Sequence, residues 1–211
     1  GTIIGHGLGV APEMIIVKNL SYAGSAAVYH SGIWTNASAP QVLYLSGTAA
    51  AANDTNVWGT SGAVTSSTFT VGDWQGTNYA DQLFVAYCFV SSQFISIGKY
   101  IGNGNADGPF VPFTNSLGVP ISPKYVLGRN YVDAGAPWFI VDDQTSPYNV
   151  RGNYLVANST AVESASNNMD FVTGGAKWRA TGYWNESTKG VVYLAIGTPI
   201  IDTDGRIIGG R

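Results

Sequence analysis

Four acidic residues are the candidates for acid–base chemistry in this 211-residue chain: Asp142, Asp143, Glu163 and Asp170. Hydrolysis of a glycosidic bond needs two carboxyl groups at a set separation in one cleft. Adjacent residues on a strand direct their side chains to opposite faces of a sheet, so Asp142 and Asp143 cannot act as such a pair. The sequence therefore predicts no catalytic residues and no enzymatic activity.

A short segment, Asn103-Gly-Asn105-Ala-Asp107-Gly, has the spacing of the first half of a calcium-binding loop. Such loops place oxygen ligands at alternate positions before a glycine and close the site with a bidentate Glu. Thr114 occupies that closing position here, and Asp107 supplies the only carboxylate. Asn103, Asn105 and Asp107 are therefore a weak Ca²⁺ candidate, and the alternative is a Gly- and Asn-rich turn. No cofactor is predicted.

The two histidines and the single cysteine do not suggest a metal centre or a nucleophile. His6 lies between glycines and His30 ends an apolar run, and neither has a second metal-ligating His or Cys near it. Cys88 lies in the apolar run Leu83 to Phe89, which is typical of a buried thiol rather than an activated one.

Aromatic residues are abundant, with six Trp and twelve Tyr. Four tryptophans lie in loop-like segments among Asn, Ser, Thr and Gly: Trp34, Trp58, Trp74 and Trp184. Flat rings beside amide and hydroxyl groups are suited to binding sugars. The same residue types are enriched at subunit interfaces. The sequence leaves both interpretations open, so these four residues are predicted to serve a glycan site or an interface.

The composition excludes some classes of partner. Charged residues make up 11% of the chain, the net charge is −3, and the ten basic residues are scattered. Nucleic-acid binding requires a basic footprint, so it is not expected. No apolar run approaches the roughly 20 residues of a membrane span, and no membrane partner is expected. The chain begins at Gly1 rather than Met, so we expect trimming or a piece of a longer protein.

The elements that must position these residues occur twice in the sequence. Five residues recur after 111 positions, as in Asn19 and Asn130, and the apolar run at 27–29 is echoed at 138–140. The recurring pairs are Pro12 with Pro123, Ile15 with Val126, Ile16 with Leu127, Lys18 with Arg129, and Asn19 with Asn130. Repetition at a fixed period is the signature of a duplicated structural unit.

Short apolar runs separated by Gly, Asn and Ser clusters indicate many short strands. Examples are the runs at 14–17, 42–45, 82–90 and 94–101, and those at 125–127 and 191–196. We therefore predict an all-β protein of two tandem, closely packed β-sandwich units, jelly-roll-like, that arose by internal duplication. The expected repeats are residues 1–93 and 94–200, followed by an extended C-terminal arm at 201–211. Whether they form two sandwiches or one merged sandwich stays open.

Several motifs together resemble a duplicated domain of tail-fibre-like and other virion proteins of tailed, notably marine, bacteriophages. They are His6 to Asn19, Val85-Ala-Tyr-Cys-Phe89, Lys99 to Val111, and the stretch from Asp142 to Asn149 that ends Ser-Pro-Tyr-Asn. At Gly128-Arg129 the chain departs from that pattern, in which a larger apolar residue or Lys precedes the basic position. The resemblance covers roughly residues 5–200.

The resemblance implies a structural role in a virion and offers no catalytic residues to transfer. The expected function is that of a tail-fibre or capsid-surface subunit that acts through homo-oligomeric assembly with itself and other virion proteins. The alternative is a carbohydrate-binding module that recognises a host surface polysaccharide. The expected location is the extracellular virion particle.

Overall fold

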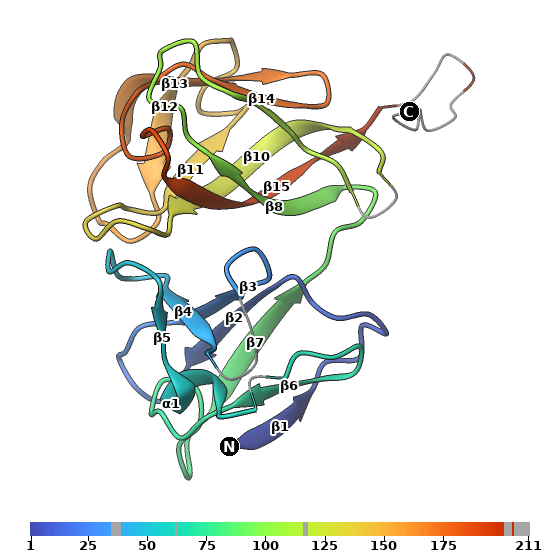
Figure 1. Cartoon of the computed structure of the whole chain (residues 1–211), viewed down its shortest axis with the longest axis vertical. Helices are drawn as coiled ribbons and strands as arrows, with labels where there is room; N and C mark the ends of the chain where they lie inside the picture. The colour runs from blue at the N-terminus through green and yellow to red at the C-terminus, as the bar shows by residue number, and fades with distance from the viewer. Residues whose placement is uncertain (35–38, 62, 116–117, 201–203, 205–211) are drawn as a thin grey trace. The chain divides into compact units, whose positions relative to one another are not determined.

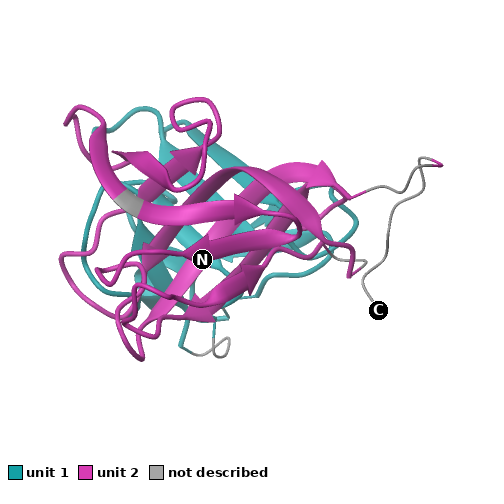
Figure 2. Ribbon diagram, turned by 90° about the horizontal axis from the view of Figure 1, so that it is seen from above, with its two compact units in different colours: residues 1–90 teal, residues 91–211 magenta. Residues whose placement is uncertain are grey.

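The chain folds into two all-β units, residues 1–90 and 91–211 (Figures 1 and 2). This computed structural model describes residues 1–34, 39–61, 63–115, 118–200 and 204. The predicted all-β class is confirmed. The units divide after Val90, slightly before the predicted boundary at 93/94, and the predicted arm at 201–211 lies outside the described residues apart from Asp204. Within the described ranges, no helix has the length and apolar character needed to cross a membrane.

The first unit is built on a meander of short strands. Its described elements are β1 (Thr2–Gly5), β2 (Met14–Asn19), β3 (Ala27–His30), β4 (Gln41–Tyr44), β5 (Ala52–Asn53), α1 (Thr55–Trp58), β6 (Thr68–Val71) and β7 (Phe84–Phe89). One sheet has the order β5-β4-β3-β2-β7, and β1 pairs with β6 in a separate ribbon. The runs at 14–17, 42–45 and 82–90 were predicted as strands, and each contains most of one strand in the structure.

The core of the first unit lies between the meander and the β6 and α1 segment. Ile15, Tyr29 and Val42 from the sheet pack with Trp58 and Phe69. Trp58 ends α1 and is only 1% exposed, so it lies in the core and not in a loop. The sequence contains no amphipathic repeat that would predict so short a helix. Its local signal is Asp54, whose side chain accepts a hydrogen bond from the Asn56 amide as an N-cap.

The second unit is one continuous sheet that folds over its own core. Its described strands are β8 (Ile95–Ile101), β9 (Phe110–Pro112), β10 (Ile121–Asn130), β11 (Phe139–Asp142), β12 (Arg151–Val156), β13 (Ser164–Val172), β14 (Gly175–Trp178) and β15 (Gly190–Pro199). Their order is β8-β15-β10-β11-β12-β13-β14-β9. β13 and β14 pack across β10 (Figure 1), so Val126, Phe139, Met169 and Trp178 share one core.

The order and the register of the strands are the same in both units. β13-β12-β11-β10-β15 repeats β5-β4-β3-β2-β7, and β9-β14 repeats β1-β6. The matched cross-strand pairs are Met14–His30 with Tyr125–Asp142, Val28–Leu43 with Ile140–Leu155, Val42–Ala52 with Tyr154–Ser164, Ile15–Cys88 with Val126–Ala195, and Ile4–Phe69 with Val111–Ala176. The duplication stays a prediction about the origin of the chain, and this agreement supports it.

The distance between matched residues changes along the chain because the connecting loops differ in length. Matched residues are 111 positions apart in β2 and β10. They are 112 apart where β3, β4 and β5 match β11, β12 and β13. They are 107 apart where β1, β6 and β7 match β9, β14 and β15. The sequence pattern aligned residues 27–29 with 138–140, whereas the register aligns Ala27 with Phe139. Asp81 and Thr188, 107 residues apart, both have positive φ, at 60° and 66°, which is uncommon outside glycine.

A buried asparagine ends the matched strands β2 and β10. Asn19 and Asn130 are almost fully buried. Each side-chain oxygen accepts a hydrogen bond from the backbone amide two residues later, at 2.8 and 2.9 Å. Each side-chain amide donates to a carbonyl in the loop before the last strand of its unit, at Gln75 and Tyr183. These asparagines therefore fix the same loop against the same strand in both units.

The buried phenol of Tyr29 makes the first unit sensitive to alkaline pH. Burial, with a smaller effect of Glu13, raises the pKa of Tyr29 to about 12. An unfolded tyrosine has a pKa of about 10, so between pH 10 and 12 the unfolded state loses its proton first and stability falls. We expect the urea midpoint of the wild type to fall more than that of Tyr29→Phe between pH 9 and pH 11. Parallel falls in the two proteins would contradict this assignment.

Candidate functional site

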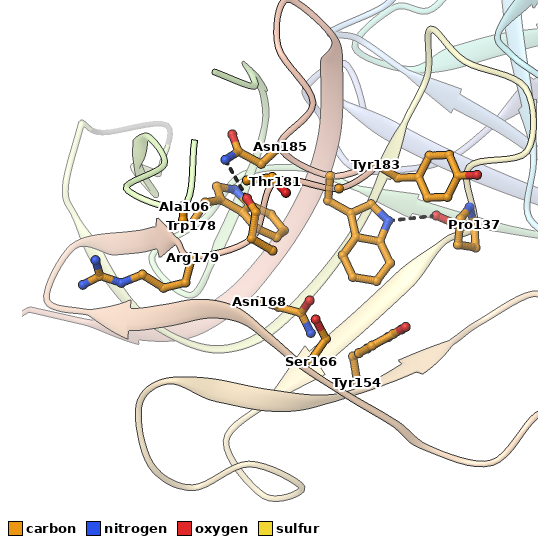
Figure 3. A pocket seen from close by; sticks show the side chains of 13 residues that line it. Ala106, Pro137, Tyr154, Ser166, Asn168, Trp178, Arg179, Thr181, Tyr183 and Asn185 are labelled. Carbon is orange, nitrogen blue, oxygen red and sulfur yellow. Dashed lines mark hydrogen bonds between the residues drawn. The ribbon is translucent and has the colours of Figure 1, made fainter. Parts of the chain in front are cut away.

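A pocket of about 620 Å³ lies in the second unit, beside the loop that connects β14 to β15 (Figure 3). One wall is the segment from Trp178 to Asn185. The other wall carries Tyr154 from β12 with Ser166 and Asn168 from β13. Tyr154 and Ser166 lie on neighbouring paired strands, so the sheet itself holds this polar wall in place.

The aromatic side chains at the pocket form a packed cluster. Trp184 lies edge-on to Tyr154, with ring centroids 4.9 Å apart, and its indole nitrogen donates to the Pro137 carbonyl at 3.4 Å. Trp178 and Trp184 are nearly buried, so they offer little ring face to a ligand. Tyr183 is 52% exposed, and in Figure 3 its ring extends away from Ser166 and Asn168, so it lies at the edge of the pocket.

Asn185 joins the aromatic loop to the segment at 103–107. Its side chain is fully buried. Its amide nitrogen donates to the carbonyls of Asn105 and Ala180, both at 2.8 Å, and its side-chain oxygen accepts from the Asn103 amide at 3.0 Å. Tyr100 adds a second tie, since its hydroxyl donates to the Trp184 carbonyl at 2.6 Å, and burial holds the pKa of this phenol well above its usual value. The loop is therefore pre-formed.

Ion pairs surround the rim at Arg179. The Arg179 guanidinium contacts the Asp170 carboxylate at 2.7 Å. Asp107 pairs with Lys177 at 2.8 Å and lies 3.8 Å from Arg179. The hydrogen bond from Lys177 and its charge lower the pKa of Asp107, and Arg179 adds a smaller effect. In Figure 3 the Arg179 side chain extends away from the polar side chains of β13, so it belongs to the rim.

The segment proposed for calcium forms consecutive side-chain-capped turns. The Asn103 side-chain oxygen accepts from the Asn105 amide, and that of Asn105 accepts from the Asp107 amide, at 3.0 and 3.1 Å. The Asp107 carboxylate is engaged by Lys177. Among the described residues, no three His, Cys, Asp or Glu side chains are grouped as a metal site would require. Calcium binding here stays a prediction, and these contacts favour its alternative, the Asn-rich turn.

Three of the four predicted tryptophans belong to the first unit and one to the second. Trp34 and Trp74 pack against the core of the first unit, where they lie edge-on to Tyr29 and Tyr44 at 4.8 and 5.4 Å. Trp58 is buried in that core, so its ring has no open face for a glycan or a partner. Trp184 belongs to the second unit and lines the pocket.

The remaining candidates for chemistry have local structural contacts. Asp142 accepts hydrogen bonds from the Gln144 and Thr145 amides, both at 2.8 Å, and Asp143 pairs with Lys124 at 2.7 Å. His30 is buried and accepts from the Gly32 amide. Burial raises the pKa of the Cys88 thiol, which disfavours the reactive thiolate.

Comparison with known proteins assigns the family. Residues 1–198 match the profile of a domain of unknown function, DUF7483. The chain belongs to this family. No curated protein and no solved structure matches it. Any function must therefore be argued from the residues and their geometry.

The sequence pattern does not single out several of the residues that line the pocket. Tyr154, Ser166 and Asn168 lie far from the aromatic loop along the chain, and only strand pairing brings them to it. The segment Trp178-Arg-Ala-Thr-Gly-Tyr-Trp-Asn185 carries three aromatic residues and an Asn within eight positions, and this density was the available signal.

Replacement of Asn185 should loosen the pocket. Asn185→Ala leaves the Asn103 amide and two carbonyls without partners, so we expect a loss of about 1–3 kcal/mol in the free energy of unfolding. Amide hydrogen exchange at 103–107 should accelerate. Ser187→Ala, an exposed position in the same loop, is the control and should change stability by less than about 0.5 kcal/mol. Equal stability of both variants would show that this asparagine does not hold the loop.

Proposed function

We propose that this chain is a structural subunit of a bacteriophage virion, in a tail fibre or a capsid-surface appendage, and that it works by assembling with copies of itself. The supporting observation is its exposed apolar surface. Large apolar side chains are exposed in both units, including Leu83 at 71% and Val162 at 88%. Others are Ile3, Leu20, Tyr87, Phe94, Phe110, Tyr148 and Tyr183.

Such side chains favour burial against another protein surface. Leu20 and Leu83 are neighbours, since the Leu20 amide donates to the Leu83 carbonyl, and adjoining exposed apolar side chains are what sites of association present. The chain has 11% charged residues, so few charges separate these side chains or oppose contact between copies. A second copy is the partner that this argument favours, because a repeated subunit supplies the same apolar surface at every position of an assembly.

The assignment to a virion rests on the resemblance of the sequence motifs to virion proteins of tailed bacteriophages. A pair of small β units with pre-formed loops is suited to a particle exposed to the environment, because folding and assembly must persist without cellular maintenance. Assembly and virion location are separate parts of the proposal and are tested separately.

Light scattering across concentration tests the assembly. We expect a discrete oligomer or a filament that persists in 1 M NaCl, because salt at that level screens ionic interactions beyond about 3 Å and leaves apolar contacts intact. A monodisperse monomer at every concentration would refute self-assembly. Mass spectrometry of purified phage particles from the encoding genome should find the chain in many copies, and its absence there would refute the virion location.

Binding of a host surface polysaccharide is a second candidate, favoured by the pocket. Tyr183, an exposed residue at the edge of the pocket, adds an aromatic side chain to a lining that includes the amide of Asn168 and the hydroxyl of Ser166. This arrangement suits a neutral sugar, which presents apolar ring faces and hydroxyl groups. Both functions can reside in one virion protein.

Titration of tryptophan fluorescence with polysaccharide released from host cells tests this second candidate. We expect quenching in the wild type and about tenfold weaker binding by Tyr183→Ala, which is about 1.4 kcal/mol. Tyr148→Ala removes another exposed tyrosine that does not line the pocket, so it should bind like the wild type. Equal affinity of the two variants would exclude the pocket as the binding site.

A further inference from the structure

The last strand of each unit has the same neighbour on one side and a different environment on the other. β7 pairs with β2, and its counterpart β15 pairs with β10 in the matched register. On its other edge β15 pairs with β8 along its length, from Gly190 with Ile101 to Ile196 with Ile95. Within the described residues, β7 pairs with β2 alone and ends its sheet.

The backbone groups on the open edge of β7 match those that β15 uses to bind β8. The Leu20 amide donates to the Leu83 carbonyl, so the backbone groups of Leu83 point toward β2. The backbone groups of the alternate residues Phe84, Ala86 and Cys88 therefore point toward the open edge. In the second unit the Gly197 amide donates to the Phe94 carbonyl, which marks the alternate residues of β15 as the ones facing β8.

The residues at alternate positions before Gly197, whose backbone groups point toward β8, are Ala195, Tyr193 and Val191. These residues follow Cys88, Ala86 and Phe84 by 107 positions, the separation of the matched strands. The open edge of β7 therefore presents the same pattern of donors and acceptors that binds a strand in the second unit.

Within the described residues, the side chains of β7 are more exposed than those of β15. Val191 and Ala195 are fully buried in the core of the second unit. Their counterparts Phe84 and Cys88 are only partly buried against the core of the first unit. Tyr87, also on β7, is 53% exposed. An added strand would cover this edge, and an unpaired edge is a template for pairing with another chain.

The sequence of β8 recurs near the end of the chain. Gly98-Lys-Tyr-Ile-Gly102 is echoed by Gly205-Arg-Ile-Ile-Gly209. The separation is again 107 residues, as between β7 and β15. Lys99 and Arg206 keep a positive charge at the same place, and Ile101 matches Ile208. The segment at 202–208 therefore has the position in the repeat and the sequence character of β8.

The order of the strands along the chain indicates which edge strand this segment would pair with. The segment that follows the first unit, β8, pairs with the last strand of the next unit, β15. By the same rule, the segment that follows the second unit pairs with the last strand of the unit after it. In a head-to-tail array of copies, that strand is β7 of the next copy.

We propose that residues 202–208 of one copy add to the open edge of β7 in a second copy as an antiparallel strand. The register of β8 on β15 places Thr203 opposite Cys88 and Ile207 opposite Phe84. Each chain then donates one strand and accepts one, so copies join head to tail into a ring or a filament. This inference deepens the proposed self-assembly and rests on it.

Removal of the donor segment is the first test. The full chain and a variant that ends at Ile200 are compared by light scattering over the same concentrations. We expect the full chain to associate and the shortened one to stay monomeric and folded, with a cooperative thermal transition that does not depend on concentration. A full chain that is itself monomeric overturns both this inference and the proposed self-assembly. A shortened chain that still associates overturns the strand donation and leaves self-assembly standing.

A disulfide to the native Cys88 tests the register. Residues opposite each other in an antiparallel pair have Cα atoms about 5.5 Å apart, within the range that a disulfide spans. Under mild oxidation Thr203→Cys should give a ladder of cross-linked species larger than dimers on a non-reducing gel. Asp202→Cys, whose side chain would point to the opposite face, is the matched control and should give no such ladder.

Addition of Cys88→Ser to the Thr203→Cys variant separates the remaining outcomes. Loss of the ladder in this double variant supports the pairing, because each chain then carries only the introduced thiol and its links give dimers only. A link within one chain would overturn donation to a second copy. Absence of any link to Cys88 in a protein that still associates would overturn the proposed pairing.

Discussion

The structure depends on the requirement that strand backbones be paired with hydrogen-bond partners. Because of this requirement, the register of one strand in a sheet determines the register of the strand beside it. β2 and β10 each lie between two partners, and the same cross-strand pairs recur around both. Because side chains alternate along a strand, this shared register also assigns the core residues, so Ile15 and Val126 are equivalent. Among the described residues, the two units differ at two places where pairing stops. β13 pairs with β14 whereas β5 and β6 belong to separate sheets, and β15 pairs with β8 whereas β7 ends its sheet.

Buried asparagines extend the same requirement into the loops. Asn19, Asn130 and Asn185 bind backbone groups that no strand satisfies. Loops held in this way keep a defined shape at low charge, since amide side chains satisfy donors and acceptors without ions. The pocket in the second unit is a consequence, because Asn185 fixes the loop that presents Tyr183. A pocket with such a rim and a surface with exposed apolar side chains can occur in one chain.

The predicted residues for chemistry and recognition separate into structural and accessible groups. Carboxylates such as Asp142 and Asp143 bind backbone amides or a lysine, and Trp58 fills the core of the first unit. Loop-like sequence around a tryptophan did not predict exposure, because the polar residues around Trp58 belong to a short helix that packs its indole inward. The sequence does not group Tyr183 with the polar side chains of β13, because the pairing of β12 with β13 and the position of a loop further along the chain bring them to one pocket.

The sequence by itself determined the all-β class and many of the strands, and it predicted the internal repeat. Alternation and glycine-rich breaks are local signals. Matching residues such as Asn19 and Asn130 can be recognised by comparing the two halves of one sequence. Tertiary structure decided the one-residue shift at Ala27 and Phe139, the burial of Trp58, the pocket walls, and the contrast between a paired β15 and an unpaired β7. These depend on loop lengths and on contacts between distant strands, and local periodicity carries no information about either.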